Sequence, residues 1–257
     1  MPAAAFDNIL ARRLTNFVAL SRKELKHLAE LQYNPLEVER GQLLLQDGQT
    51  EPKAFILHAG WGCSYKLLPN GSRQIVSFAL AGEIAGLRSV FLRKADHSFS
   101  SLTNTTVNVV EGAHIMRCVA EFPRLRAALL WAASRDAAMV VEHLVNIGRR
   151  NALERTAHLF MELAERMRQI GQQTATEFEC PLSQFVLADA LGLTPIHVSR
   201  TLRELRERKR REAHIRMLLR ELAHRSKNLL AVVLAIAKQT APRSPLIDDY
   251  LLRLTGA

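Results

Sequence analysis

Residues 181–205, PLSQFVLADALGLTPIHVSRTLREL, constrain the fold more than any other part of this chain. They predict two helices around a tight turn, because apolar residues recur at helical spacing on both sides of Gly192. Glycine adopts a left-handed turn conformation that a side chain would oppose. Thr194 followed by Pro195 is a strong helix start, since threonine caps N–H groups and proline suits the first turn. The stretch therefore predicts a helix-turn-helix.

The second helix of this motif is expected to have one buried apolar face, formed by Ile196, Val198, Leu202 and Leu205. Its polar face, near the N-terminus, suits DNA. Arg200 can form two hydrogen bonds with a guanine edge, and Thr194, His197 and Ser199 suit bases or phosphates. A plain helical hairpin with a solvated face is the alternative interpretation.

Positive charge is concentrated on and after this second helix. The chain has a formal net charge of +10, and between residues 194 and 227 eleven Lys or Arg stand against four Glu. A basic surface next to a reading helix is what a double-stranded DNA partner requires.

The 257 residues, 48% of them hydrophobic, suffice for two folded domains and a connecting helix.

The sequence gives no sign of a metal, a cofactor or a membrane segment. Cys63, Cys118 and Cys180 form no CxxC pair, so neither a zinc site nor an iron–sulfur cluster is expected. The N-terminus lacks a signal-peptide pattern, and the longest apolar run, residues 229–237, is too short to span a bilayer. We expect a soluble, cytoplasmic protein.

The first half of the chain predicts a short helical region and then strands. Ser21 and Glu24 form a capping-box pattern at the start of a helix. From residue 34 on, short apolar or alternating runs are separated by Gly, Asn and Asp, and Asn70-Gly71 is a hairpin signal. Strands at this spacing predict a small antiparallel barrel or jelly roll.

Residues 122–150 predict one long amphipathic helix, with a further helix over 152–169. The apolar positions of the long helix are Leu125, Leu129, Ala132, Met139 and Val145. This stripe suggests pairing with a second copy of the chain. Packing against the chain's own barrel is the alternative.

Residues 1–208 resemble the Crp/Fnr family of bacterial transcription regulators. The resemblance lies in the segments GQLLLQDGQ and LPNGSRQIVSFALAGEIAGL, the long helix, and LADALGLTPIHVSRTLRELRER. It implies a barrel like that of cyclic-nucleotide-binding domains, a dimerisation helix, and a helix that reads a two-fold operator. From their positions in the motif, the resemblance also implies that the DNA contacts are Thr194, His197, Ser199, Arg200 and Arg203.

The expected fold class is therefore α+β. The sensor barrel, a jelly roll, would occupy residues 1–121, the dimerisation helix 122–150, the helix-turn-helix domain 151–210, and a C-terminal helical segment 211–257. The family's β-hairpin wing has no counterpart in the pattern after Arg208.

The predicted effector site also departs from the family. Members that bind cyclic nucleotides follow a Gly-Glu segment with an arginine that grips the phosphate. Gly82 and Glu83 are present as candidate effector contacts, but residues 96–102 lack that arginine. A buried phosphate would lose its charge-assisted contacts, so we expect no cyclic nucleotide, and Glu83 would then be a structural polar residue.

The C-terminal segment, LLRELAHRSKNLLAVVLAIAKQTA, resembles the phosphoacceptor helix of HWE/HisKA-2 histidine kinases over residues 211–257. The resemblance implies that His224 is phosphorylated, beside Glu221. A surface histidine on a dimer helix is the alternative. No ATP-binding domain is recognisable, so we expect no enzyme activity by itself, and phosphotransfer would need a kinase or response-regulator partner.

Three functions follow from the sequence. The first is a dimeric DNA-binding regulator, the second a phosphotransfer protein that works through His224, and the third an inactive fusion with a poorly supported helix-turn-helix.

Overall fold

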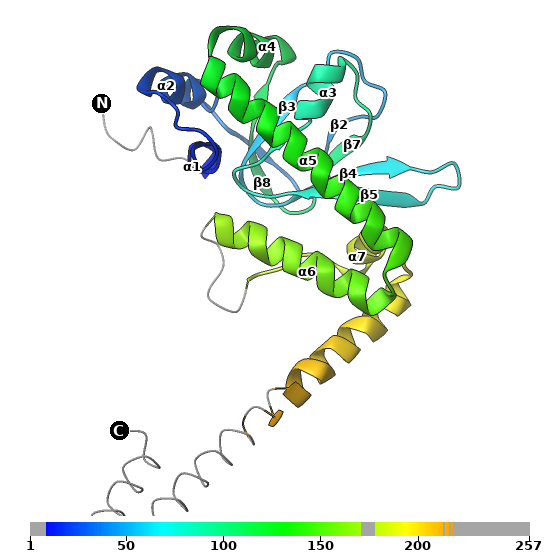
Figure 1. The fold of residues 1–257 in the computed structure, drawn as a ribbon. Coiled ribbons are helices and arrows are strands. Elements are labelled where there is room, and N and C mark those ends of the chain that lie inside the picture. The colour runs from blue at the N-terminus through cyan, green and yellow to red at the C-terminus, as the bar shows by residue number, and fades with distance from the viewer. Residues whose placement is uncertain (1–8, 171–177, 213, 216, 218–257) are drawn as a thin grey trace, which may run out of the picture. The chain divides into compact units, whose positions relative to one another are not determined.

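A computed structural model describes residues 9–170, 178–212, 214, 215 and 217 of the chain. Contacts divide the chain into two units, Met1–Leu202 and Arg203–Ala257. The first unit contains two β-sheets, the helices that cover them, and the first helix of the predicted helix-turn-helix (Figure 1). No helix in the described part of the chain is long and apolar enough to cross a membrane.

The two antiparallel sheets have four strands each. The first sheet has the order β1 (Leu36–Val38), β8 (Thr105–Val110), β3 (Ala54–Ala59) and β6 (Ile84–Ala85). The second has the order β2 (Leu43–Leu45), β7 (Ser98–Ser101), β4 (Gly62–Leu67) and β5 (Arg73–Ala79). Strands distant in sequence pair in both sheets, so the predicted jelly roll is confirmed.

The hairpin between β4 and β5 turns at the predicted Asn70-Gly71 pair. Gly71 has φ of 80°, a conformation that favours glycine. The Leu68 N–H donates to the Ser72 carbonyl at 2.8 Å and closes the turn. This local signal was sufficient because a hairpin turn is determined by neighbouring residues.

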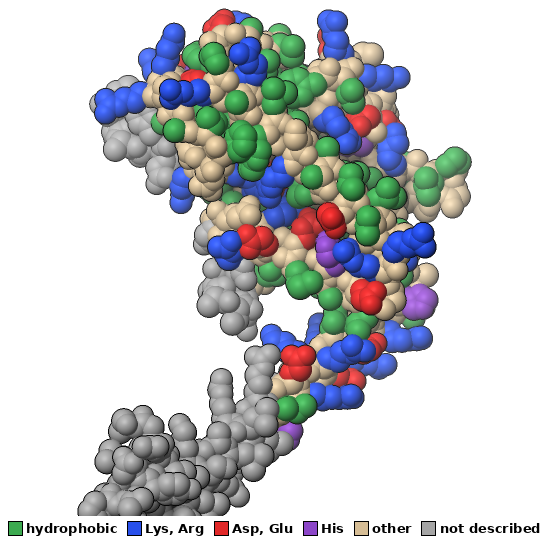
Figure 2. Space-filling model, viewed as in Figure 1, with side chains coloured by type: hydrophobic (Ala, Val, Ile, Leu, Met, Phe, Trp, Pro, Cys, Tyr) green, Lys and Arg blue, Asp and Glu red, His purple; other side chains and the backbone are tan. Residues whose placement is uncertain are grey.

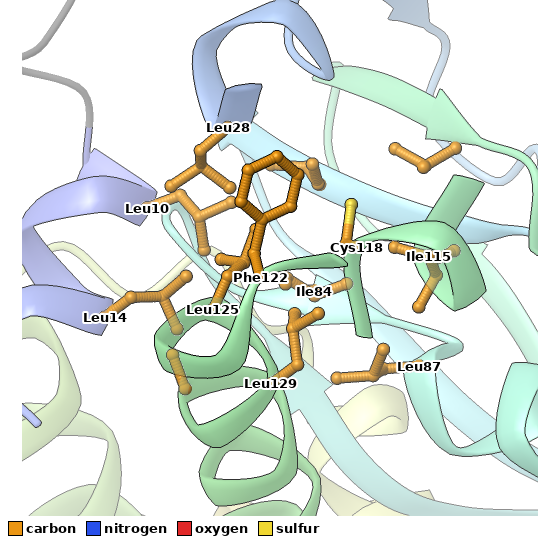
Figure 3. Packing of buried hydrophobic residues seen from close by; sticks show 14 of the residues in the cluster. Leu10, Leu14, Leu28, Ile84, Leu87, Ile115, Cys118, Phe122, Leu125 and Leu129 are labelled. Carbon is orange, nitrogen blue, oxygen red and sulfur yellow. The ribbon is translucent and has the colours of Figure 1, made fainter. Parts of the chain in front are cut away.

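Four short helices pack around the barrel: α1 (Ile9–Thr15), α2 (Arg22–Glu30), α3 (Leu87–Leu92) and α4 (Gly112–Glu121). At the start of α2, the Ser21 N–H donates to the Glu24 carboxylate at 2.8 Å and the Glu24 N–H donates to the Ser21 hydroxyl at 3.3 Å. This confirms the predicted capping box. Figure 3 shows how Leu10, Leu28 and Phe122 converge between these helices and the barrel.

The long helix α5 (Pro123–Arg149) matches the predicted segment, but its predicted stripe does not form a free dimer face. Leu125 and Leu129 are buried in the core shown in Figure 3, and Ala132 packs against it. Full burial of one leucine side chain stabilises the folded protein by roughly 1.5–3 kcal/mol. The alternative, packing against the chain's own barrel, therefore holds for this part of the stripe.

The exposed apolar side chains of α5 lie on another face, formed by Leu130, Val141, Leu144 and Val145, so that Val145 is the residue of the predicted stripe that lies on this exposed face. Positions 130, 137, 141, 144 and 148 alternate in heptad spacing along this face. The sequence pattern did not distinguish the two faces, because both carry small or apolar residues.

Two further helices, α6 and α7, follow α5 in the first unit. The helix α6 (Ala152–Gln169) has the bounds that the sequence predicts, and Asn151 caps it by accepting from the Glu154 N–H at 3.0 Å. The helix α7 (Gln184–Leu191) follows the undescribed residues 171–177.

Candidate nucleic-acid interface and effector pocket

The predicted helix-turn-helix is present in the structure. Ser183 caps α7 by accepting from the Val186 N–H at 3.3 Å, and Gly192 ends the helix with φ of 61°. Thr194 then accepts from the His197 N–H at 3.3 Å, and residues 195–212 are helical. The predicted turn at Gly192 and the predicted helix start at Thr194 are confirmed.

Polar contacts tie the turn of this motif to the barrel and to α6. The Arg73 side chain, on β5, donates to the Asp189 carboxylate at 2.9 Å. The Gln74 amide donates to the Ala190 carbonyl at 3.3 Å, and Arg155 donates to the Leu191 carbonyl at 3.2 Å. The last turn of α7 is therefore held by β5 and α6 together, in an arrangement that no local sequence pattern indicates.

The candidate DNA contacts on the second helix face solvent. Thr194, His197, Ser199 and Arg200 are all exposed. Among the described residues, the side chains of His197, Ser199 and Arg200 have no hydrogen-bond or ion-pair partner. Their donors are therefore available to a ligand.

The opposite face of this helix is buried, with one correction to the prediction. Val198 is fully buried, and Leu202 packs against the same cluster. Ile196, expected in the interior, is 73% exposed. Residues that are two positions apart in a helix point about 200° away from each other around its axis. Val198 and Ile196 therefore cannot lie on the same face. Phe185 on α7 is also exposed, at 72%.

In the second unit, residues 203–212 are helical and rich in arginine and lysine, the side chains drawn blue in Figure 2. Arg203, the remaining candidate DNA contact, is exposed. Arg208 pairs with Glu204 at 2.8 Å, and Arg211 pairs with Glu207 at 3.9 Å. The residues that the structure describes between 204 and 217 contain no strand, and the missing wing remains a prediction.

The predicted effector region forms a small cavity of about 50 Å³. Ligand pockets usually occupy roughly 300–1,000 Å³. The cavity lies between β4, β5, α3 and α5, and its charged or titratable lining residues are Glu83, Arg88, His97 and Asp136.

Glu83 is held by arginines from two helices. The Arg166 guanidinium, on α6, donates to the Glu83 carboxylate at 2.6 and 3.2 Å, and Arg13 on α1 forms a second ion pair. The Leu80 N–H also donates to this carboxylate, at 3.0 Å. Burial alone would raise the pKa of Glu83, but the charges of Arg166 and Arg13 hold it at about 2. These contacts support the structural role that the sequence suggested.

Gly82 precedes this carboxylate in a tight turn. It has φ of 79°, and a Cβ at this position would collide with the Ile9 side chain. A contact of Gly82 or Glu83 with an effector remains a prediction.

The cavity is also lined by a cation, Arg88, that the sequence did not indicate. Arg88, at the start of α3, pairs with Asp96 at 2.8 Å, and His97 donates from Nδ1 to the same carboxylate at 2.7 Å. Burial lowers the pKa of His97, although Asp96 opposes this shift. Residues 96–102 lack an arginine as expected, but the fold brings one from another element. Asp96 balances the charge of Arg88, while the buried Arg88 Nε has no hydrogen-bond partner among the described residues.

Asp136 enters the same cavity from α5. It is half-buried in the single chain. Burial, reinforced by the nearby charge of Glu83, raises the pKa of Asp136 to about 7, although Arg166, Arg135 and Arg13 oppose the shift.

The predicted phosphoacceptor His224 and its neighbour Glu221 lie outside the described residues. Their roles therefore remain predictions.

Three family models match successive parts of the chain. A cyclic nucleotide-binding domain model matches residues 35–122, a Crp-like helix-turn-helix domain model matches 154–223, and an HWE histidine kinase model matches 221–256. Both predicted resemblances are thereby confirmed.

Similar proteins are transcription regulators. Nitrogen fixation regulation protein FixK of Rhizobium meliloti is 33% identical over 170 residues, which cover 65% of this chain and 73% of that protein. Transcriptional activatory protein AadR of Rhodopseudomonas palustris is 28% identical over 188 residues, covering 73% and 75% respectively.

The solved structure of FixK2 from Bradyrhizobium japonicum has the same fold, with a TM-score of 0.62 and 24% identity over 68% of this chain and 85% of that one. These relatives do not favour the alternative of a histidine phosphoacceptor protein. The barrel, the helix-turn-helix and the relatives agree that the chain belongs to the Crp/Fnr family of transcription regulators.

Proposed function

We propose that this regulator binds a two-fold operator in duplex DNA as a homodimer, with residues 194–200 meeting the bases. Crp/Fnr regulators bind DNA and act as dimers. The observation that carries the proposal is the exposed polar face of the second helix. His197, Ser199 and Arg200 make no polar side-chain contact with other described residues, while Val198 on the opposite face is fully buried.

Arg200 is the residue proposed to read a base. Its guanidinium can donate two hydrogen bonds to the O6 and N7 atoms of guanine. Arg203, Arg206 and Lys209 would bind phosphates, which adds affinity without sequence preference.

Two arginine variants test this division of roles. Arg200→Ala is expected to reduce the preference for the operator over random duplex by about 1–3 kcal/mol. Arg206→Ala is the control, because the loss of a phosphate contact weakens operator and random duplex equally and lowers the salt slope by about one. Full operator preference in Arg200→Ala would show that base reading lies elsewhere.

The barrel is proposed to act without a cyclic nucleotide. The cavity measures about 50 Å³, Glu83 is bound by Arg166 and Arg13, and Arg88 is neutralised by Asp96. Titration calorimetry with cyclic AMP and cyclic GMP should therefore give no binding heat, and saturable binding at micromolar concentration would refute this part of the proposal.

A second function is favoured only by the match of residues 221–256 to the HWE histidine kinase model. It predicts acid-labile phosphate on His224 when an HWE kinase domain and ATP are supplied. Equal phosphate incorporation into wild type and His224→Ala would exclude it.

A further inference from the structure

Ile196 is an apolar residue that the fold leaves uncovered. It is 73% exposed in the first turn of the second helix, although the neighbouring Val198 is fully buried. Single exposed apolar residues are common on protein surfaces, so exposure alone does not indicate a role.

Local helix stability does not explain an isoleucine at this position. Isoleucine has a lower helix propensity than alanine, glutamate or lysine, because its branched Cβ restricts the side chain in a helix. The first turn of a helix also favours acidic residues, which interact with the free N–H groups. Neither packing nor the helix start therefore accounts for this isoleucine.

Ile196 lies beside the polar side chains proposed to meet the bases. Successive residues of a helix are about 100° apart, which places Ser199 and Arg200 within roughly 60° of the direction of Ile196. Thr194 fixes the start of this helix by capping the His197 N–H at 3.3 Å. In helix-turn-helix proteins the N-terminal residues of the second helix contact base edges.

Resting on the proposed function, we propose that Ile196 contacts the 5-methyl group of a thymine in each half-site of the operator. The thymine methyl is the apolar group that base pairs present in the major groove. Isoleucine can bury it, and its branched side chain has few conformations to lose on binding. Arg200 would supply the hydrogen bonds of recognition and Ile196 an adjacent apolar contact.

Replacing thymine by deoxyuridine tests this contact, because it removes the methyl group and keeps the Watson–Crick pairing. The operator is first selected from random duplex with the wild-type protein, and each thymine is then replaced symmetrically in both half-sites. At the thymine that Ile196 contacts, the replacement is expected to weaken wild-type binding by about fourfold per half-site, which corresponds to the loss of one buried methyl group. Ile196→Ala should bind the thymine and deoxyuridine duplexes at that position equally.

Two further variants separate this contact from a structural effect. Ile196→Val keeps a branched apolar side chain and should retain the methyl dependence. Phe185→Ala removes a comparably exposed apolar residue from α7, at 72% exposure, and should also leave the dependence unchanged. All three variants should have the salt slope of the wild type, since none changes a charge.

An operator whose binding depends on no thymine methyl would overturn the assignment of Ile196. So would a methyl dependence that persists in Ile196→Ala. Both results leave the proposed function standing, whereas a protein that enriches no sequence at all would refute the proposed function and the contact together.

Discussion

At the scale of single residues, Glu83 joins three parts of the first unit. Its carboxylate accepts from Arg13 on α1, from Arg166 on α6 and from the Leu80 N–H at the end of β5. Arg166 is almost fully buried and also donates to the Phe78 carbonyl at 2.7 Å. One buried carboxylate therefore holds the barrel, the N-terminal helix and the helix that leads toward α7.

Removing this charge should destabilise the protein strongly. Glu83→Gln leaves Arg13 buried without its counter-ion and leaves Arg166 with Glu162 as its remaining counter-ion, which costs about 3–5 kcal/mol. Urea denaturation measures the loss. Glu165→Gln is the matched control, because it breaks the exposed Glu165–Arg168 pair and should change stability little. A small effect of Glu83→Gln would show that the buried pairs are not needed for folding.

Asp136 should make stability depend on pH in the opposite sense from an ordinary ion-paired carboxylate. Its folded pKa, about 7, is above the usual value, so the folded state binds the proton more tightly than the unfolded state. This contribution to stability is present below about pH 4 and is lost as pH rises to about 7.

Asp136→Asn should therefore be more stable than wild type at pH 8, by about 2 kcal/mol after allowance for partial screening, with a difference that shrinks toward pH 5. Urea denaturation of both proteins at pH 5, 6, 7 and 8 measures this difference. A difference independent of pH would mean that Asp136 ionises normally in the folded protein.

At the scale of elements, one face of α5 packs against the barrel and another face is exposed. Leu125 and Leu129 are buried in the core, whereas Val141 and Leu144 are exposed. Crp/Fnr regulators act as dimers, and this exposed stripe has the spacing of a helix that pairs with its copy.

A charge on the exposed face of α5 should separate the dimer. Leu144→Arg places a cation where the leucine, 70% exposed in the single chain, would pack against the partner. Analytical ultracentrifugation is expected to show a monomer. Met161→Arg, at a position on α6 that is 64% exposed, should remain dimeric. A dimeric Leu144→Arg protein would move the interface away from this stripe.

Elements determined by neighbouring residues were predictable from the sequence. The capping box at Ser21, the turn at Gly71 and both ends of α6 follow from contacts within a few residues. The exposure of Ile196 was open to prediction as well, since helical spacing already places it opposite Val198.

Contacts between distant elements were not predictable in this way. Arg13 and Arg166 reach Glu83 across 70 and 83 residues of sequence, and Arg88 enters the cavity because α3 begins beside it. Ion pairs of this kind carry no sequence periodicity, so the sequence could not indicate which residues pair with Glu83.

At the scale of the whole molecule, the chain is a Crp/Fnr regulator whose helix-turn-helix is proposed to read duplex DNA, and the sequence after Arg208 has no pattern of a wing. The described residues after Arg203 continue as a basic helix. Phosphate attraction along such a helix is independent of sequence, so affinity alone does not demonstrate a regulator.

Selection of random duplex DNA by the purified protein, with the enriched pool rebound at two salt concentrations, tests this claim most directly. A dimeric operator-binding regulator should enrich a palindromic consensus with half-sites about one helical turn apart, and its preference over random duplex should survive at the higher salt. Binding without enrichment, which collapses at the higher salt, would contradict it and would leave only a basic helix attracted to phosphate.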